Sequence, residues 1–462
     1  MRRRSKAVAA FVALALVAAA CGGDDDSSEP ADEPADEPAD EPADEPADDV
    51  VTDFGVRADD KVIRVGINGD LSGPFASLVQ EIVASQQVYW DVFNDAGGYR
   101  GWTVEVEVLD SGYATDLGVQ NYQELAQESE DGVLMITENT GSPITATIAP
   151  DATDDNMLVI PLSWASLWPD PQYAAILEKQ TTYCNESVNG VEWMSTQVDG
   201  TPKLAIIGRP GEYGEDGSAG AKIAAEELGI EVVYDGTGAV AGDDRSAVIS
   251  EIVNSGANMV WLTLTPGETL DIFGNAVSQG FDGIWSGNSP SFDYKVHLGS
   301  DFAQQFDDYY YQSYYQAPWN TPGIPLMETI VSEMTTRRPD LLISDVYTTG
   351  WIEGIMAETL IRAAIDSGDM TRANMVALAN SGLEVDFGGL SANQSWLPDY
   401  DATIVRSSWI YDVSLPDFNV IPMSEFTPDN PGSSGMIPIE RDYIGTVAAD
   451  YVYGGPCIEA SS

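Results

Sequence analysis

Histidine and basic residues are scarce in this chain of 462 residues. It has one histidine, His297, and 20 lysines and arginines against 75 aspartates and glutamates, which gives a formal net charge of -55 at pH 7. It contains no G-x-S-x-G turn and no cluster of cysteine and histidine, so it offers no typical serine nucleophile and no metal site, and no cofactor is expected. A surface this poor in bases repels nucleic acid and anionic membranes, and neither is expected as a partner.

The first residues have the pattern of a cleaved leader. Four bases lie within the first six residues, and an unbroken apolar stretch from Ala7 to Ala20 follows, too short for a permanent membrane span. Three alanines then precede Cys21 and a glycine pair. This resembles a bacterial lipobox, in which Cys21 is lipidated and starts the mature chain. We therefore expect a lipoprotein signal peptide at 1–21, with lipid as the only membrane contact.

A low-complexity acidic segment comes next. Residues 24–49 hold 14 acids, no base and no aromatic residue, and repeat the motif ADEP. Such a segment cannot bury enough apolar surface to offset the entropy of ordering it, and its prolines and like charges keep it extended. We expect a disordered tether over 22–58. The remaining chain still has 61 acids against 16 bases once this segment and the leader are set aside.

Two cysteines remain in the mature chain. Cys184 and Cys457 are candidates for one disulfide in an oxidising compartment, where it would tie the C-terminal tail to the middle of the chain. Two buried free thiols are the alternative.

The length that follows the tether exceeds what one hydrophobic core usually holds. About 400 residues remain, so two lobes are expected. The run 62–67 predicts a buried strand, and Ser72-Gly73-Pro74 predicts a turn into a helix that ends at Gly97-Gly98. Strands and helices then alternate past residue 285. Such alternation predicts a parallel sheet covered by helices on both faces.

The alternation starts again at Lys203. The strand 204–208 leads through a glycine-rich turn into a helix that ends near Leu228, and runs at 259–264 and 284–285 predict further strands. We therefore predict an α/β fold with two doubly wound parallel-sheet lobes. Solutes bind to such sheets beyond the carboxyl ends of the strands, where helix N-termini expose N–H groups, so a cleft between the lobes is the expected site.

The start of the first series has a recognisable order: a strand, a Ser-Gly-Pro turn, a long helix ending in N-x-A-G-G-x-x-G, and a strand running into an acidic turn. The glycine-rich motif is carried by Asn94, Ala96, Gly97, Gly98 and Gly101. Further matching segments lie at 136–142, 160–166, 212–214 and 387–391. In this order the chain resembles the periplasmic binding protein type I family, in particular its branched-chain amino acid and amide branch, from about Lys61 to about Ser408.

The resemblance implies two lobes joined by a three-strand hinge. Lobe 1 would comprise 59–181 and 318–406, and lobe 2 would comprise 182–317 and 407–457. The crossovers would lie near 180–182, 315–319 and 406–409. Closure of the lobes about these crossovers would trap the solute.

The resemblance also implies ligand-binding positions. Those of lobe 1 are Gly141 and Ser142 at a helix N-terminus and the loop Ser163, Trp164, Ala165 and Ser166. Those of lobe 2 are Tyr213, Thr265 and Asn288. Hydroxyls and free N–H groups at a helix start suit a carboxylate or carbonyl oxygen, although Ser142 could be a plain N-cap.

One departure concerns the charge of the solute. Amino acid binders of this family commonly place an acid near the position of Asn288 to pair with the ligand ammonium, and the neighbouring sequence has none. Glu138 could compensate from the other lobe, or be a solvated loop carboxylate. Trp164 and Trp168 could stack on a planar part of the solute or pack in the core. An amino acid, an amide or a urea-like molecule therefore all remain open.

These features lead to one functional expectation and two alternatives. We expect a monomeric, lipid-anchored extracytoplasmic protein that delivers a small polar solute to an ABC permease in the membrane. A ligand-sensing module that reports to a receptor would have the same fold. A lipid-anchored hydrolase is the alternative from another class, and the single histidine argues against it, so no enzyme is expected.

Overall fold

The structure, a computed structural model, describes residues 50–242 and 244–459. The expected signal peptide, Cys21 and most of the expected tether lie outside these residues. Within them, no helix has both the length and the apolar composition that crossing a membrane requires.

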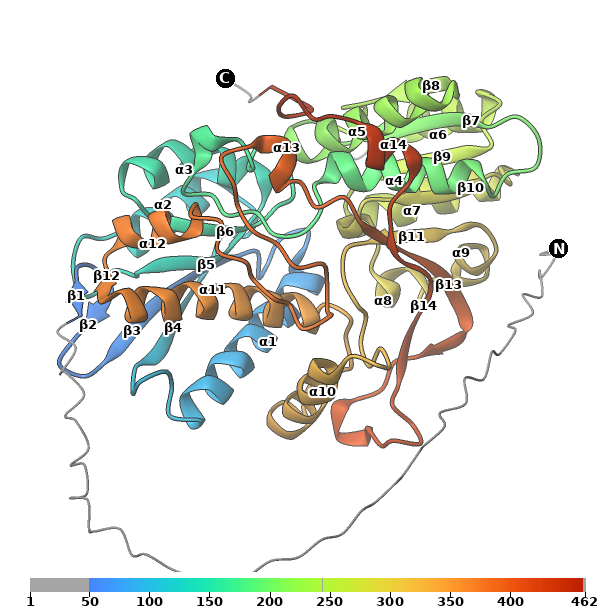
Figure 1. Ribbon diagram of the computed structural model, residues 1–462. Helices are drawn as coiled ribbons and strands as arrows, with labels where there is room; N and C mark the ends of the chain where they lie inside the picture. Colours follow the sequence, from blue (N-terminus) through green and yellow to red (C-terminus); the bar gives the residue numbers. More distant parts are fainter. Residues whose placement is uncertain (1–49, 243, 460–462) are drawn as a thin grey trace, which may run out of the picture. The chain divides into compact units, whose positions relative to one another are not determined.

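Lobe 1 is built on a sheet of four parallel strands in the order β4-β3-β5-β6. The strands are β3 (Val62–Gly69), β4 (Thr103–Asp110), β5 (Met135–Thr140) and β6 (Leu158–Leu162). The helices around it are α1 (Ala76–Asp95), α2 (Thr115–Leu125), α3 (Ser142–Asp154), α11 (Tyr347–Ser367) and α12 (Arg372–Ala379). Figure 1 shows α2, α3 and α12 on one side of the sheet and α1 and α11 on the other.

Helices α1 and α11 pack unusually close together. A Cβ added at Gly350 of α11 would lie 2.1 Å from Ser85 Oγ of α1, and one added at Gly354 would overlap the ring of Tyr89. Glycine at these two positions therefore lets a C-terminal helix complete a lobe that begins near residue 50. The chain must leave lobe 1 and return to it, as a two-lobed protein with several crossovers does.

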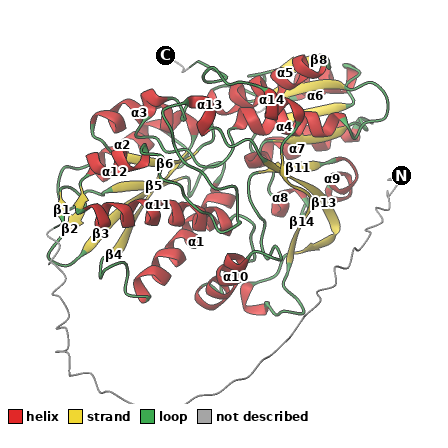
Figure 2. Cartoon of the chain, in the orientation of Figure 1, coloured by secondary structure: helices red, strands yellow, loops and turns green. Residues whose placement is uncertain are grey.

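Lobe 2 repeats the arrangement with parallel strands in the order β10-β9-β7-β8. The strands are β7 (Lys203–Gly208), β8 (Glu231–Gly236), β9 (Met259–Thr263) and β10 (Ile284–Gly287). The helices are α4 (Tyr183–Ser195), α5 (Glu212–Leu228), α6 (Ser246–Asn254) and α7 (Pro266–Ser278). The two parallel sheets and their helices are separate in Figure 2, and they confirm the predicted α/β class.

A third sheet, antiparallel, was not expected from the sequence. Its order is β11-β13-β14, formed by β11 (Tyr311–Tyr314), β13 (Ser408–Asn419) and β14 (Ser433–Tyr443). The smaller elements are β1 (Val51–Thr52), β2 (Val56–Arg57), β12 (Asp369–Met370), α8 (Tyr294–His297), α9 (Ala303–Tyr309), α10 (Pro325–Arg337), α13 (Tyr400–Thr403), α14 (Thr446–Asp450) and three 3-10 turns at 171–173, 289–291 and 423–425.

The structure corrects the C-terminal end of the expected tether. Strand β1 pairs with β12, and β2 pairs antiparallel with β3. Val56 is buried in the lobe 1 core. The folded unit therefore begins at Val50, rather than at residue 59.

An amide side chain links the first two expected crossovers, and a second amide, from α4, reaches the third. The Gln180 Nε2 atom donates to Gln316 Oε1 at 3.4 Å. Asn189 Nδ2, from α4, donates to the carbonyl of Arg406 at 2.7 Å. These bonds connect segments more than 130 residues apart in the chain at the place where it passes between the two sheets.

The C-terminal tail is fastened to lobe 2. Cys184, in the first turn of α4, forms a disulfide with Cys457 across 273 residues of sequence. Tyr453 adds a hydrogen bond from its hydroxyl to Asn185 Oδ1 at 3.0 Å. The disulfide interpretation of these two cysteines therefore holds over that of free thiols.

Candidate functional site

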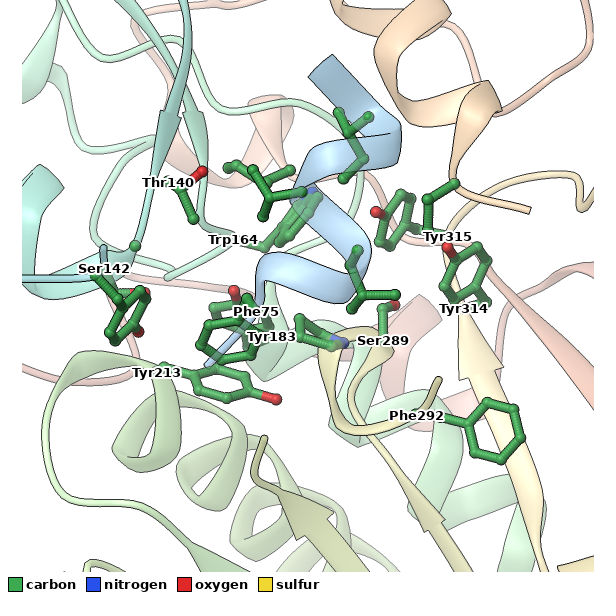
Figure 3. A pocket seen from close by; sticks show the side chains of 18 residues that line it. Phe75, Thr140, Ser142, Trp164, Tyr183, Tyr213, Ser289, Phe292, Tyr314 and Tyr315 are labelled. Carbon is green, nitrogen blue, oxygen red and sulfur yellow. The ribbon is translucent and has the colours of Figure 1, made fainter. Parts of the chain in front are cut away.

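A pocket lies between the two lobes, at the carboxyl ends of the strands where the sequence places the cleft. We call it the central pocket, and its empty space, including solvent at its mouth, is about 570 Å³. Its lining comprises Phe75, Leu78, Val79, Ile82, Tyr113, Thr140, Gly141, Ser142, Leu162, Trp164, Tyr183, Tyr213, Ser289, Pro290, Phe292, Tyr314, Tyr315 and Val346. Figure 3 shows these side chains converging from both lobes.

The start of α3 contributes as expected. Gly141 has φ of 108°, which disfavours other residues, and a Cβ there would lie 2.8 Å from the Tyr113 ring. Ser142 follows it as the first residue of α3, and both line the pocket. The first-turn amides of a helix have no acceptor within the helix, so this end of the pocket favours an oxygen of the solute.

The loop after β6 divides into one pocket residue and three supporting ones. Trp164 lines the pocket. Ser163 does not, because its hydroxyl lies 2.7 Å from Ser142 Oγ and accepts the indole N–H of Trp168 at 3.0 Å. Ala165 and Ser166 are buried away from the pocket. These three residues therefore do not line the pocket, and Trp168 packs in the core.

Ser166 instead links the lobes. Both its backbone N–H and its hydroxyl donate to the carboxylate of Asp216 on α5, and the N–H of Cys184 donates to the same carboxylate at 3.1 Å. Burial raises the pKa of Asp216 to about 7, although these hydrogen bonds oppose the shift. The loop that presents Trp164 is therefore anchored to lobe 2 by a buried acid.

Aromatic rings make up much of the pocket wall. The Trp164 ring lies 4.7 Å from that of Tyr315, and the Tyr183 ring lies 4.6 Å from that of Tyr213, as measured between centroids. The ring of Phe75 lies 6.4 Å from that of Tyr213, also measured between centroids. These rings favour a solute with an apolar or planar part.

The contact between Phe75 and Tyr213 crosses the cleft, because Phe75 precedes α1 of lobe 1 and Tyr213 belongs to α5 of lobe 2. Tyr213 lines the pocket as expected, and its hydroxyl donates to the Leu264 carbonyl at 2.9 Å. Burial raises the pKa of Tyr213 well above its ordinary value, so the hydroxyl stays neutral. Tyr213 therefore offers the solute its ring rather than a charge.

Thr265 and Asn288, expected among the ligand-binding residues, do not line the pocket. Thr265 caps α7, accepting the N–H of Glu268 while the Glu268 carboxylate accepts the N–H of Thr265. Asn288 is fully buried and donates to the Tyr183 carbonyl at 3.0 Å. The next residue, Ser289, takes its place in the pocket wall.

An acid does lie beside Asn288 in space, although none is near it in sequence. Glu186 of α4 accepts hydrogen bonds from Asn288 Nδ2 at 2.8 Å and from the Ser289 hydroxyl at 2.5 Å. Burial raises the pKa of Glu186 to about 7, against the opposing effect of these bonds. The carboxylate stands behind Ser289 rather than in the pocket wall.

The sole histidine has a structural role. The ring of His297 stacks on Phe292 at 4.7 Å, and its Nδ1 and Nε2 atoms lie within hydrogen-bond distance of backbone groups of Asp293 and Pro266. Burial lowers the pKa of His297 to about 4, so the ring is neutral at pH 7. Among the described residues, no three histidine, cysteine or acidic side chains are grouped so that they could hold a metal ion.

Sequence reasoning missed most of the aromatic lining. Tyr113, Tyr183, Tyr314 and Phe292 reach the pocket from four different segments, and Tyr315 appeared only as part of an expected crossover. Tyr183 follows directly after the first crossover, and that position next to a hinge segment was the available signal. The other rings carry no local pattern that separates a pocket wall from a core.

Comparisons with known proteins agree with this geometry. A chain of Brucella melitensis, Leu/Ile/Val-binding protein homolog 3, is 25% identical over 205 residues, which are 43% of this chain and 53% of that relative. The alignment thus spans about half the length of the curated relative.

Two solved structures share the fold. The fatty acid ABC transporter substrate-binding protein of Thermomonospora curvata has a TM-score of 0.75 at 23% identity, covering 87% of this chain and 97% of that one. An ABC transporter solute binding protein of R. palustris in complex with 4-hydroxybenzoate has a TM-score of 0.64 at 17% identity, covering 82% and 96%.

A sequence model of a protein family matches most of the chain. The model described as periplasmic binding protein matches residues 62–416, which include both parallel sheets and all three crossovers. Membership in a family of binding proteins agrees with the expectation that the chain is not an enzyme. The chain belongs to the periplasmic binding protein family, in its type I branch.

Proposed function

We propose that this chain is the solute-binding protein of an ABC importer and that its solute is a carboxylate with a large apolar body. The observation that carries the solute class is the wall of the central pocket, which contains aromatic, aliphatic and hydroxyl side chains but no charged one among the described residues. Transferring an ammonium group into such a wall without a partner is costly. This revises the small polar solute expected from the sequence.

The carboxylate is assigned to the start of α3. There Ser142 and the first-turn amides offer donors and the positive end of a helix dipole, which together can bind an anion without a basic side chain. The apolar body then lies among the rings of Trp164, Tyr183 and Tyr213. The names of the T. curvata and R. palustris relatives, a fatty acid transporter component and a 4-hydroxybenzoate complex, support this class.

Delivery to the membrane follows the family mechanism. The lobes, proposed as 50–181 with 318–406 and as 182–317 with 407–457, close around the solute about the three crossovers, and a permease recognises the closed state. Lipidation at Cys21 holds the protein at the outer face of the membrane. A sensing role with the same cleft is the second candidate, and permease genes beside this one would favour import.

Binding measurements test the proposal directly. Octanoate, benzoate, 4-hydroxybenzoate, leucine, valine and urea are compared by isothermal titration and by thermal shift, since a solute that binds the folded state raises the melting temperature. We expect octanoate or one of the benzoates to bind at least 10-fold more tightly than leucine or urea, because the wall offers the ammonium group of leucine no partner and urea has no large apolar body. Trp164→Ala should weaken that binding at least 10-fold.

A matched control separates the pocket from general damage. Val452→Ala changes a side chain that is 75% exposed and should leave affinity unchanged. Leucine or urea binding more tightly than octanoate and both benzoates would contradict the solute class. Replacement of Cys21 by serine should release the protein from the membrane fraction, and retention there would contradict the anchor.

A further inference from the structure

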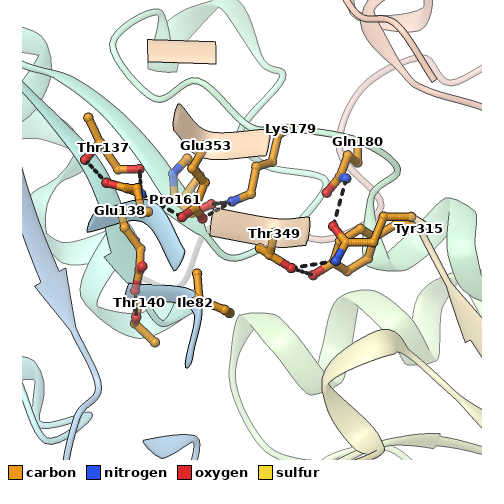
Figure 4. Close-up of polar contacts among 12 residues, drawn as sticks. Ile82, Thr137, Glu138, Thr140, Pro161, Lys179, Gln180, Tyr315, Thr349 and Glu353 are labelled. Atoms are coloured by element: carbon orange, nitrogen blue, oxygen red, sulfur yellow. Dashed lines mark hydrogen bonds and ion pairs between the residues drawn. The ribbon is translucent and has the colours of Figure 1, made fainter. Parts of the chain in front are cut away.

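A buried acid stands directly behind one hydroxyl of the central pocket. Thr140, at the end of β5, lines the pocket, and its Oγ1 atom donates to Glu138 Oε1 at 2.9 Å. Glu138 is fully buried, and its other oxygen, Oε2, has no hydrogen-bond partner in the described part of the chain. Figure 4 shows this pair beside a larger polar cluster. The structure thus corrects the interpretation of Glu138 as a solvated carboxylate.

The cluster around Glu138 has two acids and one base. Lys179, after β6, lies with its Nζ atom 2.8 Å from Oε1 of Glu353 on α11, and both side chains are fully buried. Gln86 of α1 donates to the other Glu353 oxygen at 2.9 Å. Gly69 of β3 also faces Glu138 and has no side chain to offer it. A Cβ added at Gly69 would lie 3.6 Å from Glu138 Oε1. Lys179 therefore neutralises Glu353, and Glu138 has no cation of its own.

Electrostatics favour a proton on Glu138. An ionised carboxylate without a cation is costly in a buried site, and a second carboxylate nearby adds repulsion. Burial, and after it the charge of Glu353, raise the pKa of Glu138 well above its ordinary value, against the opposing effects of Thr140 and Lys179. Oε2 accepts no hydrogen bond from the described residues that would stabilise the ionised form, and a proton on Oε1 faces Thr140 Oγ1.

We propose that Glu138 is uncharged at neutral pH and that its proton turns Thr140 into a hydrogen-bond donor for an oxygen of the solute. A threonine hydroxyl has one hydrogen and two lone pairs. When Glu138 is ionised, that hydrogen is held by the carboxylate, and Thr140 offers the pocket only lone pairs. When Glu138 is protonated, its O–H can donate to Thr140 Oγ1, and the threonine hydrogen is free to point into the pocket.

The consequence is a binding affinity linked to pH, and it rests on the proposed carboxylate solute. A carboxylate favours the state in which Thr140 donates, so it binds most tightly while Glu138 keeps its proton. Affinity falls as the pH rises through the pKa of Glu138. The solute itself stays ionised across the neutral and alkaline range, since model carboxyl groups have a pKa of about 4.

Substitutions separate this role from a structural one. Glu138→Gln is neutral at every pH and keeps an N–H donor for Thr140, so its octanoate and benzoate affinities should lie within threefold of the wild type at about pH 6. Over a series from about pH 6 to about pH 10, wild-type affinity should fall at the alkaline end while that of Glu138→Gln stays flat. Thr140→Val should bind at least 10-fold more weakly at about pH 6 and lose the pH dependence.

Thr147→Val is the matched control, because the hydroxyl of Thr147 donates to the Pro143 carbonyl on the exposed side of α3. It should leave both affinity and pH profile unchanged. Equal pH profiles in the wild type and Glu138→Gln, or an unchanged affinity in Thr140→Val, would overturn the proposal.

A measurement without solute tests the proton itself. Infrared difference spectra of the wild type minus Glu138→Gln at pH 7 should contain the carbonyl band of a protonated carboxyl group, and its absence would overturn the proposal whatever the solute is. If the band is present and no carboxylate binds at any pH, the proton on Glu138 stands and the proposed solute class is wrong. The two failures are therefore distinguishable.

Discussion

Removing the disulfide between Cys184 and Cys457 tests how far the C-terminal tail stabilises the fold. The bond closes a loop across 273 residues of sequence. In the chain-entropy model, a loop of this length restricts the unfolded chain by roughly 5–6 kcal/mol at 25 °C. The double substitution Cys184→Ser with Cys457→Ser removes this restriction without leaving a lone thiol.

The measured loss should be smaller than the loop estimate. Without the disulfide, a small apolar cluster that includes Tyr453 and a few hydrogen bonds hold the tail to lobe 2, so the tail can detach while the sheets remain folded. Tyr453 donates to Asn185, and Arg406 Nη1 donates to the Tyr451 carbonyl at 2.7 Å. We therefore expect the double variant to lose about 3–5 kcal/mol of unfolding free energy.

Equilibrium unfolding in urea, followed by tryptophan fluorescence, measures this loss. Reducing agent should shift the wild type to the midpoint of the double variant and leave the variant itself unchanged. A difference below about 1 kcal/mol, or a reductant effect on the variant, would refute the reasoning from loop entropy. The solute affinity of the variant also matters, because the Cys457 N–H donates to Ser166 Oγ at 2.8 Å in the loop that presents Trp164.

Two further predictions concern buried charges. Lys179→Met leaves the fully buried Glu353 without its cation and should cost about 3–5 kcal/mol of unfolding free energy, measured in urea. Lys222→Met breaks an exposed ion pair and should cost at most about 1 kcal/mol. Equal losses in the two variants would contradict this prediction. Asp216 has a pKa raised to about 7, so its contribution to stability is present below its ordinary pKa and is lost as pH rises toward 7. The unfolding free energy of the wild type should therefore decline over that window more steeply than that of Asp216→Asn, and parallel curves would contradict the assignment.

Local patterns in the sequence were enough to predict the two α/β lobes. The strand 204–208 and the turn into α5 were recognised because apolar runs and glycine turns are short-range features. Strand β8 was not recognised, since its burial is incomplete and its sequence, EVVYDG, mixes acids with valines. The antiparallel sheet was missed for a different reason: β11 and β13 are nearly 100 residues apart, and only the folded chain brings them together.

In the candidate site, too, features with a local sequence signal could be predicted and contacts between distant segments could not. The helix start at Gly141 and Ser142 could be predicted, because a glycine before a serine and a proline is a local signal of a helix N-terminus. The relation of Glu186 to Asn288 could not, because 102 residues separate them. The sequence indicated that no acid pairs with the solute there, and the structure shows an acid held one hydroxyl away.

The two buried acids, Glu138 and Glu186, give the hydroxyls on the two sides of the central pocket different hydrogen-bonding roles. Glu186 is held by three donors, the Asn288 amide and both the N–H and the hydroxyl of Ser289, which favour its ionised form against burial. Glu138 has one such donor, Thr140, and an unpaired second oxygen. If Glu138 keeps its proton as proposed, Thr140 can donate to the solute from lobe 1 while Ser289, whose hydrogen is committed to Glu186, can only accept from lobe 2. The uncharged wall is therefore polarised by the protonation of acids that never touch the solute.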